Sequence, residues 1–124
     1  MYSLWGNYSM IEIKIFNNDE KFEIEVIGHS GYAEIGKDIV CSAVSILSYT
    51  LLQVVSEYNF QEGDYNMLEV DHKMEAGYFY LKLRYINLTD LKAAVNTIIT
   101  GYRLVENTYP QNVSLRNMTN GDTV

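Results

Sequence analysis

Apolar and polar residues alternate in the first part of the chain. Isoleucine alternates with charged residues over residues 11–15, and apolar residues alternate with glutamate over residues 22–26. This alternation is typical of strands that are buried on one side only. The residues between them, Asn17–Glu20, are of the types that favour a turn. Residues 10–27 are therefore predicted to form a β-hairpin.

The apolar period then changes to that of a helix, from Ile39 to about Tyr58. Apolar residues recur at intervals of three and four, which predicts an amphipathic helix. The members of this stripe are Val40, Ala43, Val44, Leu47, Leu51, Val54, Val55 and Tyr58. Asp38 stands directly before the helix, and aspartate is a favoured N-cap residue.

The second half of the chain repeats the strand–strand–helix order. Residues 67–70 and 78–83 are predicted strands, and residues 87–90 carry a capping signal for a second helix. The apolar stripe of that helix is Leu88, Leu91, Val95, Ile98, Tyr102 and Val105. The expected fold is α+β in ββαββα order, with four short strands in an antiparallel or mixed sheet and two helices packed on it.

The length of 124 residues suits one domain, which we assign to residues 10–106. Residues 1–9 have no clear period, are treated as an N-terminal extension and are given no function. Residues 107–124 contain one proline and several asparagines and threonines without a sustained apolar period. They are predicted to form a loose C-terminal tail.

Charge and composition narrow the class of partner. Sixteen acidic and nine basic residues give a net charge of −7, which argues against direct nucleic-acid binding and is compatible with a basic protein partner. The single cysteine suits a reducing cytosol. We identify no signal peptide and no apolar run of membrane-spanning length, so a cytoplasmic protein without a membrane partner is expected.

Cys41 is the first candidate for chemistry. It falls in the first turn of the predicted helix, where unpaired N–H groups and the positive end of the helix dipole favour a thiolate over a thiol. It lies roughly 100° from the centre of the apolar stripe, beside Ser45, Ser48 and Leu52. The alternative is a small buried apolar residue, which describes most unpaired cysteines.

His29, at the end of the predicted hairpin, is the candidate general base; the alternative is a loop histidine bonded to the backbone. His72 is interpreted as a surface residue. Two histidines and one cysteine so dispersed do not make a zinc site by spacing. Asp38 is primarily a helix cap, and a second role in orienting His29, as in a Ser-His-Asp triad, stays open.

The loop between the hairpin and the helix supplies the candidate substrate-binding residues. Gly28, Gly31 and Gly36 are explained either by the turns of a plain surface loop or by a loop that opens for a peptide and closes behind it. Tyr32, inside this loop, is the best candidate for contact with such a peptide. Ser45 could bond near the site or be a solvated helix serine.

These residues resemble a known family. Residues 28–33, Gly-His-Ser-Gly-Tyr-Ala, and residues 36–45, Gly-Lys-Asp-Ile-Val-Cys-Ser-Ala-Val-Ser, are similar to the signature of the ribosomal-processing cysteine proteases, the Prp family. The spacing of twelve residues from histidine to cysteine matches that signature. The resemblance extends over residues 10 to about 106.

The resemblance implies a cysteine endopeptidase with Cys41 as nucleophile and His29 as proton acceptor and donor. It implies removal of a short N-terminal extension from the twenty-seventh large-subunit ribosomal protein, a homodimer, and no metal or organic cofactor. The alternative is a non-catalytic, ribosome-associated interaction module with a merely packed cysteine. A redox-sensing thiol is a third hypothesis, weakened by the lack of a second cysteine to resolve it.

Overall fold

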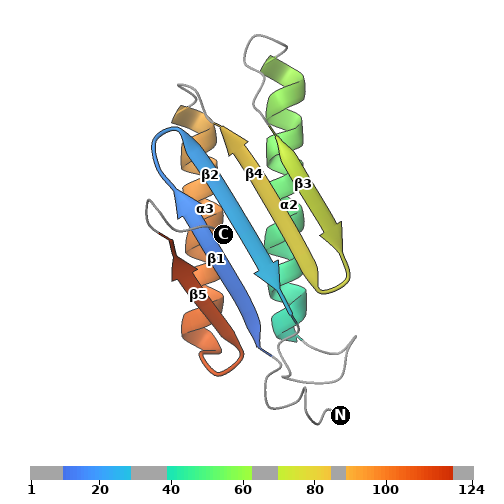
Figure 1. Cartoon of the computed structure of the whole chain (residues 1–124), viewed down its shortest axis with the longest axis vertical. Coiled ribbons are helices and arrows are strands. Elements are labelled where there is room, and N and C mark those ends of the chain that lie inside the picture. The colour runs from blue at the N-terminus through green and yellow to red at the C-terminus, as the bar shows by residue number, and fades with distance from the viewer. Residues whose placement is uncertain (1–9, 29–38, 63–69, 85–88, 119–124) are drawn as a thin grey trace.

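The computed structural model describes residues 10–28, 39–62, 70–84 and 89–118. These residues form two layers, a five-stranded sheet and two helices that cover one of its faces (Figure 1). In chain order the elements are β1 (Ile11–Asn17), β2 (Lys21–Ile27), α2 (Ile39–Glu62), β3 (Asp71–Glu75), β4 (Tyr78–Arg84), α3 (Thr89–Thr108) and β5 (Val113–Asn117). The order of strands across the sheet is β3-β4-β2-β1-β5.

The predicted hairpin at the start of the chain is confirmed. β1 and β2 pair antiparallel, with Ile13 opposite Val26 and Ile15 opposite Ile24. β4 pairs antiparallel with β2 on one side and with β3 on the other. The three central strands bury every second residue. Because side chains alternate between the faces of a strand, this pattern places one apolar face of the sheet against the helices.

Both predicted helices are present, and their apolar stripes supply the rest of the core. α2 begins at Ile39, as the position of Asp38 predicted, and ends at Glu62. Among the residues whose burial the structure describes, its buried apolar side chains are Val40, Val44, Leu51 and Val55. Those of α3 are Leu91, Val95, Ile98, Ile99 and Tyr102. The α+β class with two packed helices is therefore correct.

The predicted number of four strands is wrong, because β5 adds a fifth from the segment treated as a tail. β5 pairs parallel with β1, and the Ile11 N–H donates to the Asn112 carbonyl over 2.9 Å. The Leu115 N–H donates to the Glu106 carboxylate over 2.8 Å, which ties β5 to the end of α3. Only Val113 of this strand is fully buried, and its alternation of apolar and polar residues is limited to residues 113–116, too short to be recognised as a strand. The domain boundaries themselves stay a prediction.

The third strand also lies later in the chain than expected. The sequence predicted it at residues 67–70, but β3 spans Asp71–Glu75, and residues 63–69 lie outside the described part of the chain. β3 is an edge strand in which every side chain except that of Met74 is exposed. The apolar residues before it therefore gave a stronger strand signal than the strand itself.

One finding differs from the expected lack of a long apolar run. The segment from Ile39 to Glu57 has a mean hydropathy of 1.8, so by length and composition alone it could cross a membrane. Its serines and its threonine are only weakly polar and therefore lower the mean hydropathy little. In the structure this helix packs on the sheet, but only 28% of the segment is buried. A core helix of a two-layer protein passes the same test of length and composition.

Candidate active site

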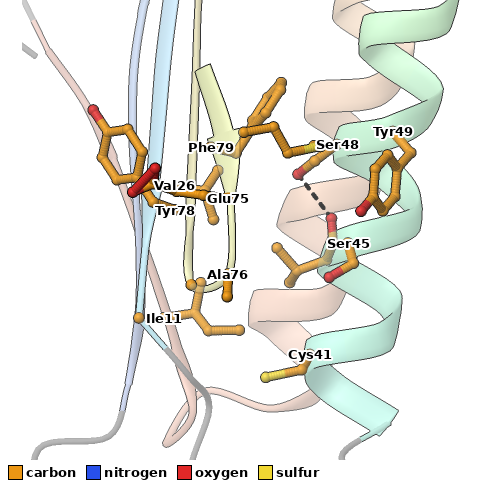
Figure 2. A pocket seen from close by; sticks show the side chains of 14 residues that line it. Ile11, Val26, Cys41, Ser45, Ser48, Tyr49, Glu75, Ala76, Tyr78 and Phe79 are labelled. Carbon is orange, nitrogen blue, oxygen red and sulfur yellow. Dashed lines mark hydrogen bonds between the residues drawn. The ribbon is translucent and has the colours of Figure 1, made fainter. Parts of the chain in front are cut away.

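A pocket of about 460 Å³ lies between the first half of α2 and the end of the sheet where β3 turns into β4. Its helix wall is formed by Cys41, Val44, Ser45, Ser48 and Tyr49. Its sheet wall is formed by Ile11, Val26, Gly28 and residues 74–79. Figure 2 shows the Cys41 side chain projecting from the first turn of α2 toward this sheet wall.

Cys41 occupies the position that its sequence predicted. It is the third residue of α2, is half-buried, and packs against the hydrophobic core from its margin. Val40 beside it is fully buried and fixes the start of the helix on the sheet. The thiol therefore combines a rigid backbone with access to a pocket. These are two requirements for a nucleophile that must meet an approaching substrate.

Gly28 is held where the hairpin ends, and its backbone explains why glycine stands there. Its φ angle is 106°, a conformation that other residues rarely adopt. A Cβ atom at this position would lie 2.6 Å from the Met10 carbonyl oxygen. The Gly28 N–H donates to the Gly77 carbonyl over 2.9 Å. This bond joins the residue that precedes His29 to the β3–β4 turn, so both line the Cys41 pocket.

Ser48 connects the pocket wall to the second helix. Its hydroxyl donates to the Val44 carbonyl over 2.9 Å, the bond drawn in Figure 2, and lies 2.8 Å from the Tyr102 hydroxyl of α3. Because serine has one proton to donate, Tyr102 then donates to Ser48. Burial raises the pKa of Tyr102, so its hydroxyl keeps that proton. The bond holds α2 on α3 at the level of the pocket.

Tyr78 belongs to both the pocket and the outer face of the sheet. Its hydroxyl donates to the Glu25 carboxylate over 2.9 Å. On the same face the Tyr80 hydroxyl donates to Glu23 over 3.0 Å. Burial, followed by the bond to Glu23, raises the pKa of Tyr80 to about 12. These tyrosines thus stay neutral donors at physiological pH, and they cross-link β2 with β4 beside the pocket.

The structure brings some of the predicted site residues together. Cys41, Ser45 and Gly28 line one pocket, and Ser45 is an exposed residue one turn beyond the thiol. His29, Gly31, Tyr32 and Asp38 lie outside the described residues, so their predicted roles stay predictions. His72 is exposed on β3, as interpreted from its sequence. Among the described residues no three His, Cys, Asp or Glu side chains form a potential metal site.

Most of the sheet wall was missed by sequence reasoning. Met74, Glu75 and Phe79 line the pocket although they stand more than thirty residues after Cys41. No spacing rule connects them to the thiol, because they are brought there by the antiparallel pairing of β3 with β4 and of β4 with β2. Tyr49 was also missed. Its position two turns after Cys41 on α2 was the one available signal, since residues at that spacing share a helix face.

Comparison with known proteins places this geometry in context. The family model of cysteine protease Prp matches residues 10–114. The ribosomal processing cysteine protease Prp of Staphylococcus aureus is 25% identical over 108 residues, which cover 86% of this chain and 97% of that protein.

Solved structures share the fold. The S. aureus protease with a covalently linked product peptide has a TM-score of 0.71 and 21% identity, covering 88% of this chain and all of that one. The same protease with a substrate peptide has a TM-score of 0.65 and 20% identity, with the same coverage. A Streptococcus mutans protein has a TM-score of 0.64 and 24% identity, covering 92% and 98% of the two chains.

Proposed function

Because this chain belongs to the Prp family of ribosomal-processing cysteine proteases, we propose that it removes the short N-terminal extension of the twenty-seventh large-subunit ribosomal protein. One observation supports this proposal above the others. The single cysteine of the chain stands in the first turn of α2 and opens into a pocket large enough for a substrate side chain. The ribosomal protein proposed as substrate is cytosolic, and we propose the same compartment for the enzyme.

The proposed mechanism uses a dyad of Cys41 and His29. His29 removes the thiol proton, and the thiolate attacks the scissile carbonyl to form a tetrahedral intermediate. His29 then protonates the leaving amine as the intermediate collapses to a thioester. Water, deprotonated by the same imidazole, hydrolyses the thioester and releases the second product. The helix N-terminus favours the thiolate throughout, and no metal or organic cofactor enters any step.

Two connections in the chain support the dyad. Gly28 lines the Cys41 pocket and is covalently bonded to His29. Asp38 is bonded to Ile39, the first residue of α2, which agrees with its proposed role as the helix cap. The base and the cap are thus bonded to residues that the structure places at the pocket and at the helix start.

The lining of the pocket favours an apolar or aromatic residue next to the scissile bond. The side chains of Ile11, Val26, Val44 and Phe79 contribute apolar surface, and Glu75 is the one charged residue among the described lining residues. Burying an aromatic ring there gains the hydrophobic free energy of its surface. An acidic side chain would lose hydration among these apolar side chains.

Peptide cleavage tests this function. We expect kcat/KM on peptides from the ribosomal protein's extension to fall about tenfold or more when the aromatic residues before the cut become alanine. Aspartate at the same positions should lower it further. The alkylation rate of Cys41 in the free enzyme is the control, since it does not depend on the peptide. Equal cleavage of aromatic and acidic peptides would contradict the assignment.

We further propose that the enzyme is a homodimer, formed through the outer surface of its helical layer. From Ile39 to Ser56, α2 has no charged residue, although the whole chain has a net charge of −7. Ile46 on α2 is 63% exposed and Leu104 on α3 is 61% exposed. Two like-charged copies repel each other least where neither carries charge. Large exposed apolar side chains also mark interaction surfaces.

A single added charge tests the dimer. Ile46→Glu buries an unpaired carboxylate in the proposed interface, so we expect sedimentation velocity to show a monomer at concentrations where the wild type is a dimer. Gln111→Glu is the matched control, because it adds the same charge at an exposed turn before β5. A wild-type protein that is a monomer at micromolar concentration would overturn this proposal.

A further inference from the structure

We propose that the exposed edge of β3 binds the backbone of the substrate, so that about five residues beside the scissile bond add to the sheet as a further strand. This inference rests on the proposed function, since it says how that site holds its peptide. The occupant is an extended segment of the substrate. It would be bound by the enzyme's main chain along most of its length and by the pocket near the bond that is cut.

β3 has one edge whose backbone N–H and C=O groups can pair with a further strand. Among the described strands it pairs only with β4, so its other edge has a row of backbone groups without a strand partner. In an antiparallel pair, every second residue directs its N–H and C=O away from the neighbouring strand. Glu75 and Tyr78 face each other across the two-residue turn and so form a hydrogen-bonded pair. By this alternation, His72 and Met74 direct their N–H and C=O groups away from β4, to the unpaired edge.

The pocket joins this edge to the nucleophile. Met74 and Glu75, the last two residues of β3, line the same pocket as Cys41. Figure 2 shows Ala76 and Cys41 around the lower part of this space, with Glu75 on β3 and Tyr49 on α2 higher in the view. A second hollow on the same helix shares Tyr49 with this pocket and is also lined by Leu52 and Gln53. A peptide that leaves Cys41 along α2 therefore passes beside β3.

The lengths of the two walls agree. On the helix wall Gln53 stands twelve residues after Cys41, which is about 18 Å at the helical rise of 1.5 Å per residue. The five residues of β3 extend for about 17 Å. An extended peptide of about five residues has the same length. Both walls can therefore contact one peptide over the same stretch.

The distribution of side chains on β3 leaves the approach to the pocket open. Met74 faces the helical layer, because its partner on β4 is the buried Phe79. Lys73 and Glu75 lie on the other face, where their charged groups are 4.0 Å apart. Charges on an edge strand discourage uncontrolled pairing between copies. The charged groups of Lys73 and Glu75 point away from the helices. The peptide would enter on the opposite side, between β3 and the helices.

The other edge of the sheet differs from β3. β5 pairs only with β1 among the described strands and thus also has one edge without a strand partner. No residue of β5 lines the Cys41 pocket. The nucleophile thus stands beside one of two available edges. A protease needs its substrate extended at the scissile bond, and edge pairing supplies that conformation without reading the peptide's side chains.

Substrate peptides with a single N-methyl group test the pairing. N-methylation removes one backbone donor and keeps the chain extended, so its effect should alternate along the peptide. We expect kcat/KM to fall about three- to tenfold at every second position over about five residues on one side of the cut, and to change less than twofold between them. Losses without this alternation, or no losses beyond the scissile bond, would overturn the proposal.

The unmethylated parent peptide separates this inference from the proposed function. If the wild-type enzyme cleaves it and Cys41→Ala does not, the protease assignment stands whatever the methylated series shows. If the parent is not cleaved, binding of the N-methyl series to Cys41→Ala by calorimetry provides the same readout. A Kd that rises at every second methylated position would support the edge pairing, and a Kd that is the same for all positions would overturn it.

A pair of variants tests the enzyme's side of the same bonds. His72→Pro removes an outward N–H that β4 does not use, and proline is tolerated at such edge positions. His72→Ala removes the same side chain and keeps the N–H. We expect kcat/KM for His72→Pro to lie at least threefold below that for His72→Ala, with equal thermal stability and equal alkylation of Cys41. Equal kcat/KM in the two folded variants would contradict the proposal.

Discussion

Replacing Cys41 by alanine is expected to lower kcat/KM for peptide cleavage by about 10⁴-fold or more, because no other side chain can form the thioester. The fold should survive. Cys41 stands at the margin of the core rather than within it, so the loss of one sulfur atom should cost only about 1 kcal/mol of unfolding free energy. The measurement is the initial rate of cleavage, with circular dichroism and thermal unfolding as the test of folding.

Ser42→Ala is the matched control for this substitution. Ser42 is the next residue of the same helical turn and its side chain is exposed. The Ser42→Ala protein should therefore cleave the peptide at the wild-type rate. A folded Cys41→Ala protein with wild-type activity would refute the mechanism. Titration of the thiol distinguishes the remaining hypotheses. A thiol that reacts rapidly near neutral pH supports the enzyme, and an inert one supports a non-catalytic interaction module.

Replacing His29 by alanine is expected to lower kcat/KM by about 10²- to 10⁴-fold, the usual contribution of a general base. It should also move the alkylation of Cys41 by iodoacetamide to higher pH. The direction of this pH shift follows from the charges of the two groups. An imidazolium next to a thiolate stabilises the charged form of the thiol, so removing the imidazolium raises the pKa of Cys41.

The measurement is the alkylation rate of Cys41 against pH in the wild type and in the variant. His72→Ala is the control for this profile, because it removes the other histidine of the chain from an exposed position on β3. Superimposable curves for His29→Ala and the wild type would show that His29 and Cys41 are not coupled. The helix N-terminus would then be the main source of thiolate stabilisation.

By itself, the sequence determined those features that depend on residues close together in the chain. The alternation of isoleucine with charged residues was enough to predict the first hairpin, because it records which side of each strand is buried. Asp38 and the stripe that starts at Val40 predicted where α2 begins, and so placed Cys41 in its first turn. The candidate nucleophile therefore followed from local rules of capping and periodicity alone.

Only the tertiary structure decided the edges of the sheet and the far wall of the pocket. β3 has no alternation of apolar and polar residues, and that of β5 is limited to residues 113–116. Both strands are held mainly by backbone pairing, with β4 and β1 respectively. The bond between Ser48 and Tyr102 joins residues 54 positions apart. Met74 and Phe79 join the Cys41 pocket only through the pairing of β3 with β4 and of β4 with β2. Such contacts depend on backbone groups that every residue has, which is why no local pattern predicts them.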